Sequence, residues 1–187
     1  MGKIALCQNM SLDGVMQSPG PTDVPFQHRG WAVEVDGGSG AGRFSLESAQ
    51  KAEAILLGRV TYEAMQAFWP TVDGELADTL NELPKYVVSS TLTEPAWNAT
   101  VLGDDWPEEV ARLREELAGD IVVYGSRRLS HALIGMGLVD ELRLLVYPVV
   151  LGTGDRLFGV AEDKIALDLV ASRPTGNGVQ AMTYELA

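Results

Sequence analysis

The chain has 187 residues, of which 46% are hydrophobic and 21% are charged, a balance typical of an ordinary globular protein and not of a disordered chain. Lys and Arg number 14 against 26 Asp and Glu, and the resulting net charge of -12 repels nucleic-acid phosphates and anionic membranes over most of the surface. The single cysteine, Cys7, excludes a disulfide framework or a cysteine-rich zinc site within one chain, as is typical of a reducing cytoplasm.

The length predicts one domain over residues 1–187. Residues 1–11 contain neither a charged leader nor a continuous apolar stretch, so we do not expect a signal peptide. No run reaches the roughly 18 apolar residues that a membrane span needs. We therefore expect a cytoplasmic protein that binds neither membranes nor nucleic acid.

The N-terminal part begins with a β-capable run at residues 3–9, which stops at an Asp13-Gly14 turn. Residues 15–43 are rich in proline and glycine and include a Gly-Gly-Ser-Gly-Ala-Gly run, which predicts a long loop. Long loops inside compact domains are commonly functional. Helical spacing follows at residues 44–52.

The middle of the chain alternates strand and helix patterns. Short apolar runs predict buried strands, and amphipathic spacing between them predicts helices. Asp105 and Glu108 have the spacing of a capping box at the start of one of these helices. In chain order, the expected elements are a strand at 54–57, a helix at 59–68, strands at 85–89 and later at 120–124 on either side of a helix at 105–117, and a helix at 126–134.

The C-terminal part is richer in strands. Residues 141–151 predict a long strand that Pro148 interrupts. Residues 167–175 and 179–186 flank a Gly-Asn-Gly sequence, which predicts an antiparallel hairpin. The whole pattern predicts an α/β fold with three layers, in which helices flank a central mixed, mostly parallel sheet that ends in this hairpin.

Three predicted strands end in glycine or hydroxyl residues that we expect to open a helix, and such ends meet at one edge of a parallel sheet, where ligands bind. Helix N-termini and arginines at this edge suit phosphate groups. The alternative is that the glycines only make tight turns and the arginines are solvated. The residues concerned are Gly58, Arg59 and Thr61, then Ser89, Ser90 and Thr91, and finally Gly125, Ser126, Arg127, Arg128 and Leu129.

Neither a G-x-G-x-x-G fingerprint nor a P-loop lysine motif is present, so a nucleotide has to be held in another way. Four motifs in order resemble the dihydrofolate-reductase superfamily, and in particular the C-terminal reductase domain of bacterial riboflavin biosynthesis (RibD). The resemblance covers nearly the whole chain. The motifs are MSLDG at 10–14, LGRVTYE at 57–63, VYGS at 123–126 and GLVDEL at 137–142.

The resemblance implies a dihydrofolate-reductase-like fold and an NADPH-dependent reductase that transfers a hydride to a small heterocycle, either pteridine-like or a ribosylaminopyrimidine. The residues at the strand ends would then hold the cofactor. Gly58, Arg59 and Thr61 would lie on the phosphate-bearing side of the adenosine, residues 89–91 near the 2′-phosphate, residues 125–129 over the pyrophosphate, and Met10 near the nicotinamide. The resemblance also implies a homodimer, for which we expect the apolar segment 143–150 to pair or pack with a second copy.

On the substrate side, Asp13 matches the family position nearest the substrate, where a carboxylate binds a ring nitrogen or helps to deliver a proton. Its alternative is a plain turn residue. Trp31 is a candidate wall for a flat ring, or else a core or loop-anchoring residue. Residues 152–155 form either the opposite wall or a turn. His28 and His131 lack the spacing of a zinc site, so we assign no metal.

Two further functions are open at this point. One is the riboflavin-pathway reductase of phosphoribosylaminouracil itself, which needs a basic patch for the substrate's ribose phosphate, with Arg156 as the one spare candidate. The other is a non-catalytic nucleotide-binding interaction protein that keeps the fold and the cofactor edge. Asp13 argues against the second, because a carboxylate at that position suits catalysis.

Overall fold

A computed structural model of the chain describes residues 2–21, 24–159 and 164–186. Its strands are β1 (Ile4–Ser11), β2 (Ala52–Gly58), β3 (Lys85–Val88), β4 (Ala99–Leu102), β5 (Asp120–Tyr124), β6 (Glu141–Tyr147), β7 (Leu167–Gly176) and β8 (Val179–Leu186). They form one sheet in the order β4-β3-β2-β5-β1-β6-β8-β7. Neighbours from β4 to β6 are parallel, whereas β8 pairs antiparallel with both β6 and β7. The predicted fold class is confirmed.

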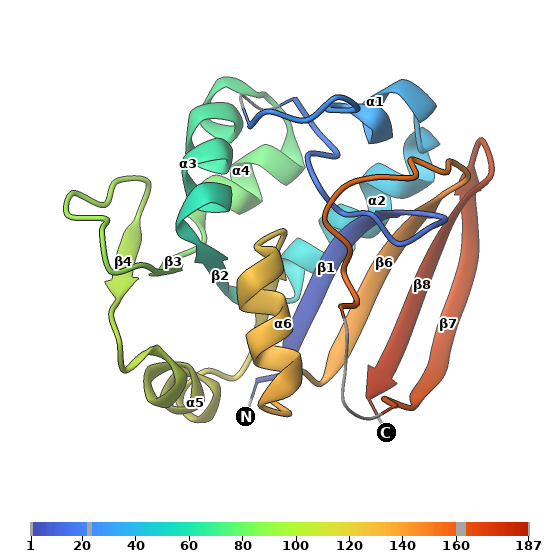
Figure 1. Cartoon of the computed structure of the whole chain (residues 1–187). Coiled ribbons are helices and arrows are strands. Elements are labelled where there is room, and N and C mark those ends of the chain that lie inside the picture. The colour runs from blue at the N-terminus through green and yellow to red at the C-terminus, as the bar shows by residue number, and fades with distance from the viewer. Residues whose placement is uncertain (1, 22–23, 160–163, 187) are drawn as a thin grey trace.

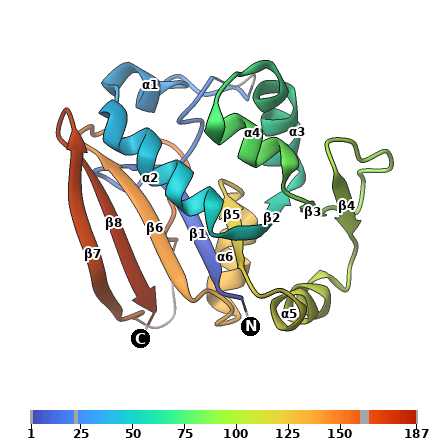
Figure 2. The same cartoon turned by 180° about the vertical axis from the view of Figure 1, so that it is seen from behind.

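Helices cover both faces of the sheet, which makes three layers. Their bounds are α1 (Trp31–Val35), α2 (Gly38–Gln50), α3 (Arg59–Phe68), the 3₁₀ turn η1 (Trp69–Thr71), α4 (Glu75–Glu82), α5 (Trp106–Glu116) and α6 (Arg127–Gly135). In Figure 1, α6 lies in front of the central strands. Figure 2 shows α2 crossing the opposite face, with α4 beside it. The helices predicted at 59–68 and 126–134 correspond to α3 and α6.

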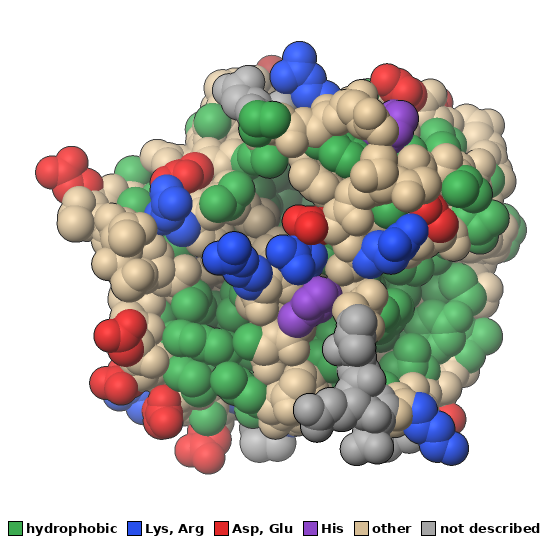
Figure 3. Space-filling model, in the orientation of Figure 1, with side chains coloured by type: hydrophobic (Ala, Val, Ile, Leu, Met, Phe, Trp, Pro, Cys, Tyr) green, Lys and Arg blue, Asp and Glu red, His purple; other side chains and the backbone are tan. Residues whose placement is uncertain are grey.

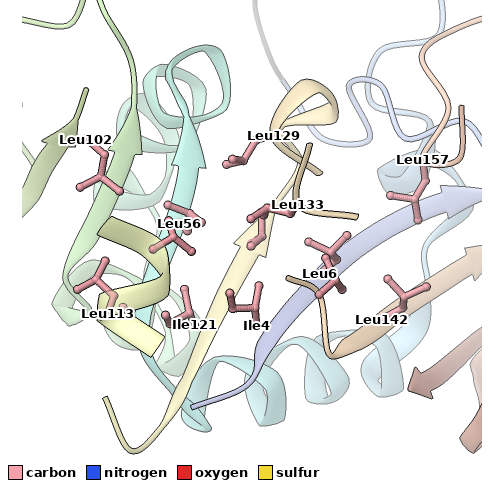
Figure 4. Packing of buried hydrophobic residues seen from close by; sticks show 14 of the residues in the cluster. Ile4, Leu6, Leu56, Leu102, Leu113, Ile121, Leu129, Leu133, Leu142 and Leu157 are labelled. Carbon is pink, nitrogen blue, oxygen red and sulfur yellow. The ribbon is translucent and has the colours of Figure 1, made fainter. Parts of the chain in front are cut away.

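The side chains of the central strands point alternately to the two faces of the sheet, so the core has two halves. In β1, Ile4 and Leu6 point into the cluster beneath α5 and α6 (Figure 4), whereas Ala5 and Cys7 join the cluster beneath α2, α3 and α4. All four side chains are less than 9% exposed. Because successive side chains of a strand point to opposite faces, an unbroken apolar run is what a strand covered on both sides requires.

The long loop predicted for residues 15–43 is partly wrong, because α1 and the first turns of α2 lie within it. The glycine-rich run begins α2, where it lets the helix approach the turn between β7 and β8. A Cβ atom on Gly40 would lie 2.5 Å from the carbonyl oxygen of Thr175, and one on Gly38 would lie 3.1 Å from it. The glycines therefore serve close packing here, although glycine lowers helix propensity.

Two other local predictions need correction. Asp105 is the N-cap of α5, but its side chain makes no capping hydrogen bond, so the capping box is wrong while the helix is right. Residues 89–91 do not open a helix, because they begin an irregular connection from β3 to β4. Neither β4 nor α4 was predicted, and both are short elements.

The segment expected to pair with a second copy is also an interior one. Residues 141–147 form β6, which pairs with β1 on one side and β8 on the other. Its backbone groups are therefore already used, so the prediction of strand pairing with a second copy through β6 is wrong, whereas packing of the segment 143–150 against a second copy stays a prediction. The free edges of the sheet are β4 and β7, and the homodimer itself stays a prediction. Within the described ranges, no helix is both long and apolar enough to cross a membrane.

Candidate functional site

A cavity of about 1010 Å³ opens where the parallel strands β2, β3 and β5 end, and residues 7–9 of β1 also line it. This edge is the place where open α/β sheets bind ligands. The cavity brings together all but one of the residues predicted to hold the cofactor. Those that line it are Gly58, Arg59, Thr61, Ser89, Ser90, Thr91, Gly125, Ser126, Arg127, Arg128 and Leu129.

Reciprocal hydrogen bonds join two of the strand ends at the rim of the cavity. The Gly58 amide donates to Ser126 Oγ at 2.8 Å, and the Ser126 amide donates to Thr61 Oγ1 at 2.9 Å. The Ser126 hydroxyl in turn donates to the Tyr124 carbonyl at 3.1 Å. These bonds fix the start of α3 against the start of α6, so that both helix N-termini border the same space.

The turn between β5 and α6 has a backbone that favours glycine. Gly125 and Ser126 both have positive φ, at 52° and 57°. The Gln8 side chain holds the turn from β1, because its amide donates to the Gly125 carbonyl at 3.1 Å and its oxygen accepts from the Gly125 amide at 3.1 Å. Ser130 Oγ also donates to the Gly125 carbonyl at 3.0 Å. The turn is therefore fixed before any ligand arrives.

Both helix N-termini suit an anion. The first amides of a helix have no partner inside it, and neither α3 nor α6 has a side-chain cap. Arg59 pairs with Glu63 at 2.8 Å and Arg127 with Asp155 at 3.0 Å, both on the surface, where such pairs hold their partners weakly. Figure 3 shows Lys and Arg side chains in a band beside a hollow on this face, although the chain is acidic overall.

At the end of β3, the hydroxyl of Ser89 shapes the loop. Ser89 Oγ accepts the amides of Thr91 at 3.1 Å and Leu92 at 3.0 Å, which is a local turn of the kind that serine favours. Ser90 and Thr91 are exposed and line the cavity. Their hydroxyls are thus accessible to a ligand from solvent.

Asp13 does not line this cavity. Its carboxylate accepts hydrogen bonds from Ser11 Oγ at 2.7 Å and from the amides of Leu151 and Gly152 at 3.1 and 2.9 Å. The Ser11 hydrogen bond, followed by the backbone amides and opposed by burial, lowers the pKa of Asp13 from 3.8 to about 2. The ionised carboxylate therefore joins the turn after β1 to the chain after β6, and the catalytic role expected for it stays a prediction.

Trp31 and Met10 also lie outside the cavity lining. Trp31 is 2% exposed, its indole donates to the Gln17 carbonyl at 2.9 Å, and its ring packs edge-on against Tyr147. Met10 packs against the core beneath α5 and α6. The structure thus does not bring these two side chains to the cofactor edge, and their ligand contacts stay predictions. Asp155, from the segment 152–155, does line the cavity.

Sequence reasoning missed the far end of the cavity, which is apolar. Side chains of α3, η1 and α4 form its wall, namely Met65, Phe68, Trp69, Leu76 and Leu80. Beside it, Cys7, Gln8, Asn9, Ser45 and Tyr124 line both this cavity and a recess of about 60 Å³. The position of Cys7, Gln8 and Tyr124 at the ends of predicted strands was the available signal. Within the described ranges, no cluster of His, Cys, Asp and Glu can hold a metal ion.

Comparison with known proteins agrees with this arrangement. Residues 3–181 match the family model of the RibD C-terminal domain. The chain is 34% identical over 137 residues to the uncharacterised protein YyaP of Bacillus subtilis (strain 168), a match that covers 71% of this chain and 73% of YyaP. The match to YyaP therefore does not indicate an activity.

Solved structures share the fold at low sequence identity. A protein of Shewanella sp. PV-4 provisionally assigned to riboflavin biosynthesis superposes with a TM-score of 0.72 and 19% identity, over 100% of this chain and 99% of that one. Dihydrofolate reductase of Enterococcus faecalis, in complex with NADP(H) and RAB-propyl, has a TM-score of 0.61 and 18% identity, with 99% and 96% covered. The expected family resemblance and the dihydrofolate-reductase-like fold are confirmed.

Proposed function

The chain belongs to the RibD C-terminal domain family of reductases, and from this premise we propose that it is an NADPH-dependent reductase that transfers a hydride to a small heterocycle. The observation that carries the proposal is the joined pair of helix N-termini. The Gly58, Thr61 and Ser126 contacts aim the free amides of α3 and α6 at one cavity. Aligned amides and nearby guanidinium groups are what a pyrophosphate requires.

The cofactor would extend along the edge of the sheet. In this proposal the amides of residues 127–129 hold the pyrophosphate, and Arg59 and Thr61 lie beside the adenosine phosphates. Ser89, Ser90 and Thr91 would bind near the 2′-phosphate. A bound nicotinamide would supply the hydride, and residues 7–9 of β1 would line its part of the cavity. A volume of about 1010 Å³ is at the upper end for ligand pockets, and it leaves room for a second ligand.

Titration with NADPH and NADH tests the cofactor assignment. We expect NADPH to quench Trp fluorescence with a Kd at least tenfold below that for NADH, because one charge-assisted hydrogen bond to the 2′-phosphate is worth about 1.5–3 kcal/mol. Arg59→Ser should reduce this preference. Arg112→Ser, on α5 and away from the cavity lining, is the control and should leave both affinities unchanged. If neither NADPH nor NADH binds, the reductase proposal is refuted.

Asp13 is the proposed substrate-side carboxylate, and its hydrogen bonds also predict an effect on stability. Asp13→Asn puts an amide NH₂ where the carboxylate accepts backbone N–H groups. We expect the variant to bind NADPH normally, to lose turnover, and to melt about 3–6 °C lower at pH 7. Unchanged NADPH oxidation would remove Asp13 from the mechanism.

The pH dependence of this effect has a definite sign. Because the folded pKa of about 2 lies below the ordinary 3.8, the ionised carboxylate stabilises the fold above about pH 3.8. That contribution is lost as the pH falls toward 2. The difference in melting temperature between Asp13→Asn and the parent chain should therefore shrink over this range, and a constant difference would contradict the assignment.

A further inference from the structure

Tyr124, the last residue of β5, has a buried hydroxyl that the described part of the chain leaves unpaired. Its oxygen is shielded from solvent and has no hydrogen-bond partner. A buried polar group without a partner costs about 1–3 kcal/mol, so such a group needs an explanation. Tyr124 lines both the large cavity and the adjoining recess, so a ligand is one partner that the site can provide.

Two polar side chains near Tyr124, those of Gln8 and Arg143, are committed to the protein. Gln8 holds the turn at Gly125. Arg143 donates through Nε to Glu141 at 2.6 Å and through Nη2 to Asp120 at 2.5 Å, and its Nη1 faces the Ser48 carbonyl at 3.5 Å. Burial raises the pKa of the Tyr124 hydroxyl well above 10, and Arg143 opposes this only partly. The hydroxyl is therefore a neutral donor at physiological pH.

Charge distribution separates the two ends of the cavity. Three lining arginines belong to the starts of α3 and α6: Arg59, Arg127 and Arg128. At the other end, the described lining offers only Arg143, and acceptors surround its guanidinium. The wall from Met65 to Leu80 on α3, η1 and α4 is apolar. Burying an anion here without a free cation is unfavourable.

We propose that the apolar end of the cavity binds an uncharged planar heterocycle and that Tyr124 Oη donates a hydrogen bond to a carbonyl oxygen or ring nitrogen of that ring. The inference rests on the proposed function, because it assigns to the substrate the end of the cavity that the proposed cofactor does not occupy. It makes a phosphorylated substrate unsuitable. A ribose phosphate would meet aliphatic and aromatic side chains where it needs donors and positive charge.

Tyr124→Phe tests the proposal through a fluorescence titration with pterin, an uncharged bicyclic ring with carbonyl and ring-nitrogen acceptors. Titrations are run with and without saturating NADP⁺. We expect the parent chain to bind pterin and Tyr124→Phe to bind it about tenfold more weakly, with NADP⁺ affinity unchanged. The control is Tyr86→Phe, which removes a hydroxyl from β3 outside the cavity lining and should change neither affinity.

Two further measurements separate ligand recognition from structure. Pterin-6-carboxylate, the same ring with a negative charge, should bind at least tenfold more weakly than pterin. The ligand-free Tyr124→Phe variant should melt at the same temperature as the parent or higher, because it removes an unpaired buried group.

The outcomes are distinct. Equal pterin binding by Tyr124→Phe and the parent, or no pterin binding by the parent, would overturn the inference whether or not NADP⁺ binds. A lower melting temperature for the variant would also overturn it, because the hydroxyl would then serve the fold. Failure of NADP⁺ to bind, with the tenfold pterin difference present, would refute the cofactor proposal and leave the Tyr124 assignment supported.

Discussion

Replacement of Arg143 by Met is expected to lower the free energy of unfolding by about 3–5 kcal/mol, because it leaves the buried Glu141 and the partly buried Asp120 without the Arg143 cation. Arg143 is 4% exposed and lies on β6 opposite Cys7 of the neighbouring β1. Its guanidinium binds Glu141 on the same strand and Asp120 at the start of β5. The side chain thus links β6 to β5 across the intervening strand β1, and it lines the recess.

Urea denaturation at pH 7 measures the effect, and the chain offers a matched control. Arg173 also pairs with a carboxylate, Glu47, but both side chains are more than 40% exposed. Arg173→Met should therefore cost less than about 1 kcal/mol. Comparable losses for the two variants would show that burial does not strengthen the Arg143 contacts, contrary to the expectation.

The acid limb of the stability curve gives a second readout. Burial raises the pKa of Glu141, but the hydrogen bond and charge of Arg143, together with Lys3, outweigh it and bring the pKa below the usual 4.5. Ionised Glu141 therefore stabilises the fold above about pH 4.5, and this contribution is lost as the pH falls through the lower folded value. In Arg143→Met, burial still raises the pKa of Glu141, but the lowering effect of Arg143 is gone. The stabilisation that ionised Glu141 gives above about pH 4.5 should therefore shrink or become a destabilisation.

Much of the fold was predictable because its central strands are buried on both faces. The run at 54–57 and the strand at 120–124 are largely apolar, and such runs identify interior strands without knowledge of their neighbours. The glycine-rich segment at 37–42 shows the limit. Two of its glycines pack closely against Thr175, which is far away in sequence, whereas local composition alone favours a loop there.

The candidate site divides in the same way. Residues at strand ends, such as Gly58 and Gly125, were predictable because topology alone brings them to one edge. The apolar wall was not, since Phe68 and Leu76 carry ordinary helical spacing and only the packing of α3 and α4 against η1 brings them to one wall of the cavity. Trp31 shows the reverse case, because an aromatic side chain in a glycine-rich segment suggests a binding wall while the structure buries it against Tyr147.

Gly125→Ala is expected to weaken NADPH binding at least tenfold, because a methyl group in the turn that positions α6 would press against the Thr61 side chain. The new Cβ would lie 3.0 Å from Thr61 Cγ2 and 3.1 Å from Thr61 Oγ1. Thr61 Oγ1 accepts the hydrogen bond from the Ser126 amide. A displaced Thr61 side chain would therefore weaken the hydrogen bond that joins the starts of α3 and α6. In addition, the φ of 52° costs an L-residue about 1–2 kcal/mol.

Gly137→Ala is the matched control, because it separates backbone strain from contact. Gly137 also has a positive φ, of 66°, but a Cβ there meets nothing within 4 Å. Both variants should therefore lose about 1–2 kcal/mol of stability, measured by urea denaturation, while only Gly125→Ala loses NADPH affinity. Equal affinities for the two variants would mean that the junction between α3 and α6 does not shape the cofactor site.

Adding Thr61→Ser to Gly125→Ala provides the decisive comparison. Serine lacks the methyl group that the new Cβ would approach most closely, yet it keeps the hydroxyl that accepts the Ser126 amide. We expect the double variant to regain part of the lost NADPH affinity, while the backbone strain at position 125 persists because φ there is still positive. Recovery of binding without recovery of stability would show that the contact with Thr61, and not the strained backbone, controls NADPH affinity.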